Sequence, residues 1–163
     1  MSDRSLDISL TVNGERVQER VDPRRTLVDF LREDLSLTGS HVGCEHGVCG
    51  ACTVRVNGDI VRGCLMLAVQ CDGAVVETIE GLSDSGEVAD LQAAFEQRNA
   101  LQCGYCTPGM LATAQDLLKR AKTVPSREEI REHISGNYCR CTGYHAIVDA
   151  VEAVAQARAG VRK

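Results

Sequence analysis

Nine cysteines are the residues of this 163-residue chain whose type and spacing are best suited to chemistry. Three of them follow the pattern C-x4-C-x2-C, and a fourth comes after eleven further residues. Sites of the plant type, which bind a 2Fe–2S cluster through four thiolates, have this asymmetric spacing. The set consists of Cys44, Cys49, Cys52 and Cys64. We therefore predict that these four cysteines bind one 2Fe–2S cluster.

Glycines between these cysteines support a cluster, because glycine readily adopts the left-handed conformations that turn backbone N–H groups toward one point. Gly43, Gly47 and Gly50 lie in the loop. Their N–H groups can hydrogen-bond cluster sulfurs and offset the negative charge. Two other uses of the same thiols compete. Disulfides suit an oxidising compartment and an even number of cysteines, whereas four-thiolate zinc sites usually use paired C-x2-C elements.

A second set of four cysteines has a less specific spacing. It combines a C-x2-C with a C-x-C thirty-two residues further on: Cys103, Cys106, Cys139 and Cys141. On spacing alone, zinc, a redox dithiol and a cluster all stay open. Cys106 and Cys141 each lie just before a predicted helix, and the positive end of a helix favours an anionic centre. A 2Fe–2S cluster is therefore the preferred interpretation, with zinc as the alternative.

The composition places these sets in an ordinary globular chain, with 44% hydrophobic and 25% charged residues. The net charge of −5 is spread along the sequence without a basic stripe, which argues against a nucleic-acid partner. Residues 1–5 are polar and have no apolar signal core, and no stretch is long enough to span a membrane. We expect a cytoplasmic chain, in which cysteines stay reduced and available to metal. Export together with a partner that carries the signal is the alternative.

Alternating apolar residues in the first half predict a small sheet that frames the first cysteine loop. We expect strands at residues 8–12, 17–21, 52–56, 60–62 and 75–79. Asn13-Gly14 and Asn57-Gly58 are the preferred pair for tight hairpin turns. Leu27, Phe30, Leu31 and Leu35 fall on one face of a short helix. This pattern predicts an α+β domain over residues 1–80.

The apolar period becomes helical in the second half, after residues 81–86, which have the composition of a linker. We expect four short helices, near residues 88–95, 107–121, 126–134 and 142–155. Thr107 and Thr142 are the expected N-caps of the second and fourth helices, and Ser126 with Glu129 forms a capping box for the third. This pattern predicts a compact helical domain over residues 81–163.

Three motifs resemble those of a known family. They are the runs Gly43–Thr53, Gln102–Met110 and Asn137–Tyr144. These runs contain seven of the eight cysteines in the two sets, and Cys64 alone lies outside them. In this order they are similar to the small iron–sulfur subunits of the molybdenum hydroxylases, the superfamily of xanthine dehydrogenase and aldehyde oxidoreductase. The resemblance extends from about Ile8 to about Ala155. No ligand position departs from the family pattern.

The resemblance implies a β-grasp, ferredoxin-like N-terminal domain and a four-helix C-terminal domain, each with one 2Fe–2S cluster. It implies an electron-transfer subunit of a molybdenum-dependent oxidoreductase, in a heterotrimer or a dimer of heterotrimers. Electrons would pass from a molybdopterin centre in a large subunit to the second set of cysteines, then to the first set, then to FAD on a medium subunit. It also implies that Gln102 and Cys141 lie close to the molybdopterin of the partner.

Other residues add no chemistry to this interpretation. Cys71 matches no ligand pattern, and we expect a buried thiol whose role stays open. No catalytic nucleophile–base set and no phosphate motif is evident. A stand-alone two-cluster carrier and a zinc-stabilised interaction module remain alternatives. Within the family, an N-heteroaromatic or aldehyde substrate is preferred, while carbon monoxide dehydrogenase and hydroxybenzoyl-CoA reductase remain open.

Overall fold

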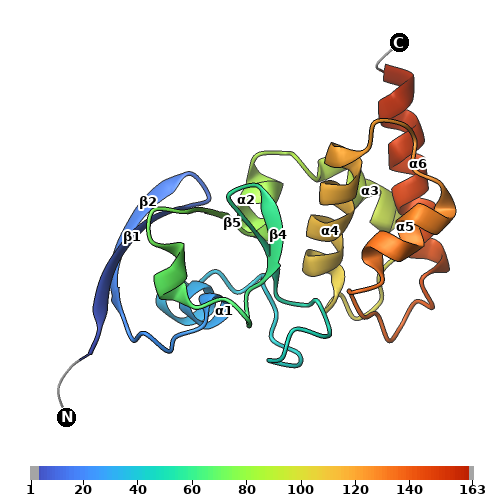
Figure 1. The fold of residues 1–163 in the computed structure, drawn as a ribbon. Coiled ribbons are helices and arrows are strands. Elements are labelled where there is room, and N and C mark those ends of the chain that lie inside the picture. Colours follow the sequence, from blue (N-terminus) through green and yellow to red (C-terminus); the bar gives the residue numbers. More distant parts are fainter. Residues whose placement is uncertain (1–3, 162–163) are drawn as a thin grey trace.

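The computed structural model describes residues 4–161 and has two halves, each with a hydrophobic core of its own. The strands lie at one end of the molecule and most of the helices at the other, so that the two termini are far apart (Figure 1). The fold class is therefore α+β, as predicted. The predicted domain ranges 1–80 and 81–163 include residues 1–3 and 162–163, which lie outside the described residues.

Five strands form one mixed sheet in the first half. They are β1 (Leu6–Val12), β2 (Glu15–Val21), β3 (Thr53–Val56), β4 (Asp59–Arg62) and β5 (Val75–Glu77). The order is β2-β1-β5-β3-β4, with β1 and β5 parallel and the other neighbours antiparallel. Both hairpins turn on an Asn-Gly pair whose φ angles lie between 50° and 90°. Type I′ turns need such positive angles, so the predicted turns are confirmed.

The short helix of the first half packs on this sheet through the residues that the sequence placed on one face. It begins as α1 (Leu27–Asp29) and continues as a wider π-helical turn, η1 (Phe30–Asp34). The Thr26 side chain caps it by accepting from the Asp29 N–H at 3.2 Å. Leu27, Phe30 and Leu31 are fully buried in one cluster with the sheet. A short 3₁₀ segment, η2 (Ala68–Cys71), completes this core.

The predicted linker at residues 81–86 is wrong, because a helix, α2 (Ile79–Asp84), occupies most of it. Leu82 is buried against Val88 and Ala112, and this apolar contact holds the segment in place. Gly81 is needed for close approach, since a Cβ there would overlap the Asn13 side chain. The glycine therefore lets α2 lie against the β1–β2 turn. The predicted strand at 75–79 ends at Glu77, because α2 already begins at Ile79.

The four predicted helices are all present as α3 (Ala89–Gln97), α4 (Thr107–Arg120), α5 (Arg127–Ile134) and α6 (His145–Val161). The capping box is confirmed: the Ser126 N–H donates to Glu129 at 2.7 Å, and the Glu129 N–H donates to Ser126 Oγ at 3.2 Å. Two other caps were misplaced. Cys106, not Thr107, is the N-cap of α4, and α6 begins three residues after Thr142.

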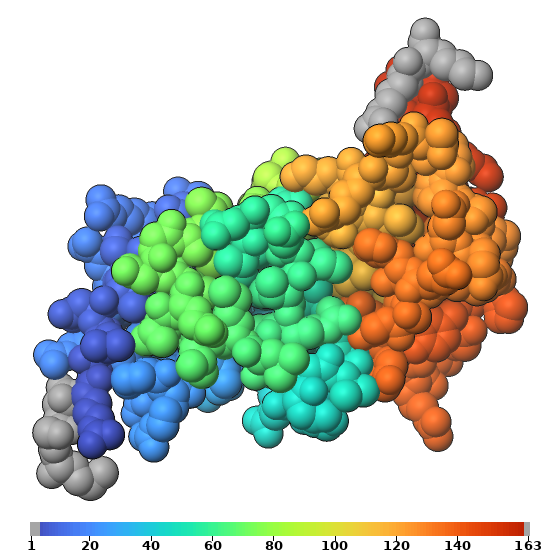
Figure 2. Space-filling model, viewed as in Figure 1, coloured from blue at the N-terminus to red at the C-terminus, as the bar shows by residue number. Residues whose placement is uncertain are grey.

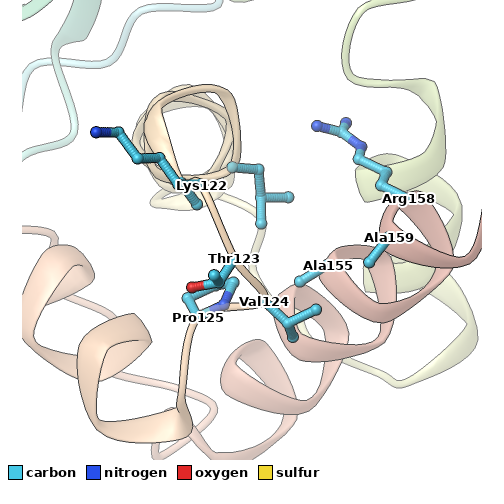
Figure 3. Close-up of a pocket in the computed structure, with 9 residues that line it drawn as sticks. Lys122, Thr123, Val124, Pro125, Ala155, Arg158 and Ala159 are labelled. Carbon is cyan, nitrogen blue, oxygen red and sulfur yellow. The ribbon is translucent and has the colours of Figure 1, made fainter. Parts of the chain in front are cut away.

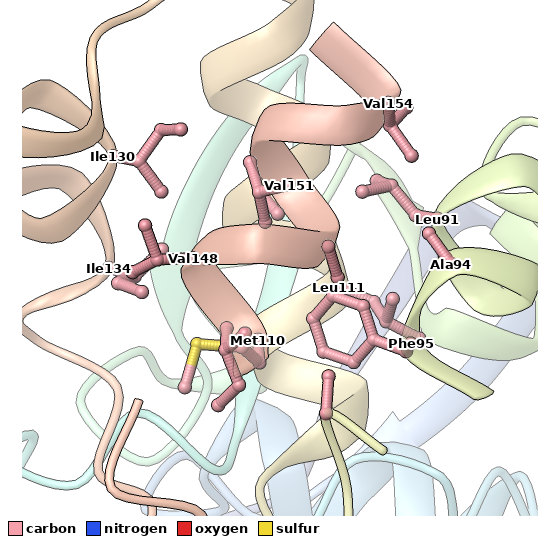
Figure 4. Close-up of a cluster of buried hydrophobic side chains, with 14 of the residues drawn as sticks. Leu91, Ala94, Phe95, Met110, Leu111, Ile130, Ile134, Val148, Val151 and Val154 are labelled. Atoms are coloured by element: carbon pink, nitrogen blue, oxygen red, sulfur yellow. The ribbon is translucent and has the colours of Figure 1, made fainter. Parts of the chain in front are cut away.

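The helical half is held together by aliphatic side chains with few aromatic residues among them (Figure 4). Leu91 and Phe95 on α3 meet Met110 on α4 and Val151 on α6, and each of these four residues is at most 1% exposed. The buried residues of this core come from α3–α6 and from Ala100, with Ile79 of α2 packed against them, while the sheet core uses residues up to Val76. Among the described residues, no helix is both long enough and apolar enough to cross a membrane.

Charged side chains connect the two halves where the hydrophobic cores do not. Arg55 on β3 is only 4% exposed and binds Glu77 on β5 at 2.7 Å and Glu87 before α3 at 2.6 Å. Glu87 also accepts from Gln115 on α4 at 3.0 Å, and Gln115 accepts from Arg158 on α6 at 2.9 Å. The hydrogen bond from Arg55 lowers the pKa of Glu87 from its ordinary value of 4.5 to about 2.

This pKa predicts how the ion pair responds to acid. A carboxyl whose pKa is lowered by folding stabilises the folded chain above its unfolded pKa, and this contribution is lost as the pH falls from about 4.5 through about 2. At pH 7 we expect Glu87→Gln to lower the melting temperature by about 2–4 °C, which corresponds to about 1 kcal/mol. The difference between variant and parent should narrow below pH 4.5 in thermal melts. A constant difference down to pH 2 would contradict the pairing.

Candidate metal centres

Eight of the nine cysteines come together in two groups of four, which match the two predicted sets. The interactions between thiols that shift their pKa values all connect members of the same set. Cys52 interacts with Cys49 and Cys64. In the other set, Cys103 and Cys141 place their sulfurs 3.5 Å apart. The fold therefore forms two separate thiol quartets, which we call the first quartet (Cys44, Cys49, Cys52, Cys64) and the second quartet (Cys103, Cys106, Cys139, Cys141).

The loop of the first quartet turns its backbone N–H groups toward one sulfur. Glu45, Gly47 and Gly50 have φ angles of 58°, 83° and 74°, in the left-handed region that favours glycine. The Cys49 N–H lies 3.4 Å from the Cys44 sulfur. This hydrogen bond, followed by that of the His46 N–H, lowers the pKa of Cys44 to about 6. The loop thus stabilises an anionic sulfur, as the glycine pattern predicted.

The inner side of the first quartet is apolar. Cys52 is 2% exposed and Cys64 is 9% exposed, and both pack with Val28 and Val42. Burial raises the pKa of Cys52 to about 11. A buried thiolate needs positive charge beside it, and metal ligation supplies that charge. One sulfur stabilised by backbone N–H groups and two thiols in an apolar floor fit an iron–sulfur cluster well.

The second quartet has a buried side and an exposed side. Cys106 and Cys139 are half-buried, whereas Cys103 and Cys141 are exposed. Burial, followed by the neighbouring Cys139, raises the pKa of Cys106 to about 12. Burial opposes ionisation of Cys139 too, but hydrogen bonds from Thr142 lower the pKa of that thiol. The quartet therefore has one open edge, through which a group outside this chain can approach it.

Only one ligand pair of the second quartet lies at a helix N-terminus, contrary to the sequence prediction. Cys106 is the N-cap of α4. Cys141 is instead followed by a turn in which Gly143 and Tyr144 have φ angles of 65° and 70°. The Tyr144 hydroxyl accepts from the Cys139 N–H at 2.9 Å, so this turn fixes the C-x-C segment from one side. Of the two cysteines, only Cys106 therefore lies at the positive end of a helix dipole.

Two observations test whether the second quartet fits a cluster. The Thr107 hydroxyl, next to Cys106, is buried without a hydrogen-bond partner among the described residues. Such a group is costly to leave unpaired, and the sulfurs of an anionic cluster would accept a hydrogen bond from it. Within the described chain, no three His, Cys, Asp or Glu side chains are arranged to hold one metal ion. A 2Fe–2S cluster does not need such a group, because each iron takes two cysteines.

A small hollow of about 140 Å³ lies between the two quartets. Its lining contains Cys49 of the first quartet and all four cysteines of the second. A larger hollow, about 270 Å³, lies between the segment Lys122–Pro125 and α6 (Figure 3). That hollow contains no cysteine, and its Arg158 already binds Asp90 at 2.7 Å. The chemistry of this chain is therefore concentrated at the junction of the two halves.

Direct hydrogen bonds join the two cysteine loops at this junction. The Tyr138 N–H donates to the Cys49 carbonyl oxygen at 2.8 Å. The Tyr105 hydroxyl donates to the Val42 carbonyl at 2.7 Å, and its ring stacks on His41 with centroids 4.5 Å apart. Figure 2 shows the loop of the first quartet lying directly against the segment that carries the end of the second. Cys49 therefore contacts the second loop directly. Tyr138 and Tyr105, which each directly precede a cysteine of the second quartet, contact the first loop.

The remaining residues named from the sequence fall into two groups. Gln102 and Cys141 lie together at the exposed edge, where the Gln102 side-chain N–H donates to the Cys141 carbonyl at 3.1 Å. Cys71 lies in the sheet core with no cysteine beside it, and burial raises its pKa to about 11. Asn137 is a contact residue that sequence reasoning missed, although it stands inside one of the quoted motifs.

Comparisons with known proteins agree with this geometry. Residues 10–103 match the 2Fe-2S iron-sulfur cluster binding domain family, and residues 78–152 match the 2Fe-2S binding domain family. The chain is 53% identical to caffeine dehydrogenase subunit gamma of Pseudomonas sp. (strain CBB1), over 90% of this chain and 89% of that one. It is 54% identical to the nicotine 6-hydroxylase small subunit of Paenarthrobacter nicotinovorans, over 92% and 89%.

A solved structure is similar over almost the whole chain. The crystal structure of quinoline 2-oxidoreductase from Pseudomonas putida 86 contains a chain that superposes with a TM-score of 0.90 at 49% identity. The match covers 98% of each chain. Similarity on this scale includes both halves and the junction between them.

The separation into two quartets predicts that the two clusters can be removed one at a time. Cys49→Ala should abolish one 2Fe–2S signal in the low-temperature electron paramagnetic resonance (EPR) spectrum of the reduced chain and leave the other. Cys106→Ala should remove the complementary signal. If both variants lose the same signal and both keep the other, the two quartets do not bind independent clusters.

Proposed function

The chain belongs to the small iron–sulfur subunits of the molybdenum hydroxylases, and we propose that its eight quartet cysteines bind two 2Fe–2S clusters that relay electrons through it. One observation carries this proposal: the two quartets meet where the Tyr138 N–H donates to the Cys49 carbonyl. When bound, a 2Fe–2S cluster accepts and passes on one electron at a time. Two such clusters at a fixed separation form a relay.

The residues of this chain hold and tune the centres, and they carry out no substrate chemistry. N–H groups of the first loop stabilise the Cys44 sulfur, and the apolar floor beside Cys52 and Cys64 excludes water. Hydrogen bonds to ligand sulfurs and the degree of burial both set the potential of a cluster. The two quartets differ in both respects, so we expect their potentials to differ.

The exposed surfaces give the relay a direction. The second quartet opens at Cys103 and Cys141, beside Gln102, and we assign this edge to a large subunit that binds molybdopterin. The Gln102 side chain uses an N–H group for its contact with Cys141, so its oxygen takes no part in that contact and can face the pterin. The first quartet is rimmed by Val48 and Leu65, which are 44% and 64% exposed. We assign this rim to a medium subunit that binds FAD, in a heterotrimer.

We also propose domain ranges and a cellular compartment for the chain. Residues 1–80 would form the ferredoxin-like domain and residues 81–163 the helical domain, in keeping with the two separate cores of the described residues. We place the chain in the cytoplasm, where its thiols stay reduced until the clusters are inserted. The two compared relatives are named for caffeine and nicotine, and the solved structure for quinoline. An N-heteroaromatic substrate for the whole enzyme is therefore preferred over carbon monoxide or a hydroxybenzoyl-CoA.

Metal content tests the two centres directly. The isolated full chain should contain four iron atoms and four acid-labile sulfides, because each quartet binds one 2Fe–2S cluster. Elemental analysis and sulfide release measure both values on one sample. Zinc in place of iron, or two irons in a chain whose second quartet is intact, would contradict the relay.

Purification from the native source separates the subunit from a free carrier. We expect the chain to co-elute with a large chain that contains molybdenum and a medium chain that contains FAD. Size-exclusion chromatography with molybdenum and flavin analysis of the same fractions measures this association. Elution of a fully loaded chain by itself would favour a stand-alone two-cluster carrier.

A further inference from the structure

The junction between the quartets is built on one buried amide side chain, that of Asn137. This residue is 1% exposed and lies two positions before Cys139. Its Nδ2 donates to the Gly50 carbonyl at 3.0 Å and to Thr53 Oγ1 at 3.3 Å. Its Oδ1 accepts from Arg62 at 3.4 Å and from Thr113 Oγ1 at 3.0 Å, where the one Thr113 O–H is shared with the Gly109 carbonyl at 2.9 Å. All the donors and acceptors of the amide are therefore used.

The orientation of this amide is determined by its neighbours. A carbonyl oxygen can only accept, and a guanidinium can only donate, so Nδ2 must face Gly50 and Oδ1 must face Arg62. Arg62 further donates to the Gly136 carbonyl at 2.8 Å and to the Thr53 hydroxyl. We call Asn137, Arg62, Thr53 and Thr113 the Asn137 hub.

Each residue of the Asn137 hub lies on a segment that also carries a ligand of one quartet. Gly50 and Thr53 flank Cys52 and follow Cys49 in the first loop. Thr113 is on α4, the helix that begins directly after Cys106. Arg62 lies two residues before Cys64. The hub therefore connects four segments that carry ligands: 49–53, 62–64, 106–113 and 137–139.

Backbone packing around the hub leaves little room for adjustment. A Cβ at Gly50 would lie 2.5 Å from the Gly136 carbonyl oxygen, and a Cβ at Gly109 would overlap the Gly50 carbonyl oxygen. Among the described residues, the buried members of each hydrophobic cluster lie within one half, and Ile79 at the start of α2 packs across to the helical half. Beside the quartets, the two halves meet through this close backbone packing and through directional hydrogen bonds.

We propose that Asn137 is a positioning residue of the relay, and that its side chain fixes the distance and relative orientation of the two centres. The inference rests on the proposed two-cluster function. Removal of the amide donor leaves the Gly50 carbonyl with only the N–H and hydroxyl of Thr53, which belong to the same loop. The Asn137 side chain then no longer holds that loop against the C-x-C segment, and the loop shifts relative to it. The clusters remain bound, but the electronic coupling between them falls.

The test uses the full chain loaded with iron and compares Asn137→Asp with the parent. Aspartate has nearly the same shape, but it presents an oxygen to the Gly50 carbonyl in place of the donor and adds a negative charge beside Arg62. Thr113→Val, described below, adds no charge and separates the two effects. In the EPR spectrum of the dithionite-reduced chain, we expect both signals to remain while the magnetic splitting between them changes. The rate of electron transfer between the clusters after a reducing flash should fall, since electronic coupling decreases as the distance between two centres grows.

Two further variants make the result decisive. Thr113→Val removes one partner of Oδ1 without changing the ligand segments and should give a smaller change of the same kind. Glu87→Gln weakens the ion pairs that connect the halves away from the cysteines, and should leave the splitting and the rate unchanged.

Each outcome has one meaning. An unchanged splitting and rate in Asn137→Asp, or an equal change in Glu87→Gln, would overturn the proposal. If Asn137→Asp loses iron, an unchanged splitting in fully loaded Thr113→Val would overturn it. A single reduced centre in the parent chain would instead refute the relay itself, so the two failures are distinguishable.

Discussion

Thiolates removed from water must find compensating charge, and this constraint organises both halves of the molecule. An isolated anionic sulfur in an apolar floor is unfavourable, which is why burial raises the pKa of Cys52. The fold meets the constraint differently in its two quartets. In the first, a loop with left-handed residues directs N–H groups at Cys44. In the second, Cys106 lies at the start of α4, and Thr142 stabilises Cys139. The irons must supply the rest of the positive charge.

Local patterns in the sequence were enough to predict most elements. The Asn-Gly turns, the alternating strands and the Ser126–Glu129 capping box depend on residues that are near one another in the chain, and all are confirmed. The helix at 79–84 was missed because residues 81–86 have the composition of a linker, although Gly81 is needed for close approach to Asn13. The N-cap of α4 was misplaced by one residue because Cys106 itself occupies that position.

The quartets could be predicted from spacing, but the junction between them could not. The cysteines share a residue type and a regular spacing, so their pattern is visible in one dimension. Asn137 and Gly50 are 87 residues apart and have no pattern in common. A single asparagine in a loop is most often explained by a turn, and only the folded chain reveals its partners. The same holds for Arg55 and Glu87, whose contact joins β3 to the segment before α3.

Each cluster would also act as a crosslink in a chain whose two cores are modest in size. The first cluster would close a loop from residue 44 to residue 64, and the second a loop from residue 103 to residue 141. Each half would therefore contain one crosslink of its own. Loop-closure entropy differs little between them, by about 0.6 kcal/mol for a near doubling of length. The order of maturation is therefore governed by topology: three ligands of the first site come from a single loop, whereas the second must wait for α4 and α5 to bring Cys139 and Cys141 back.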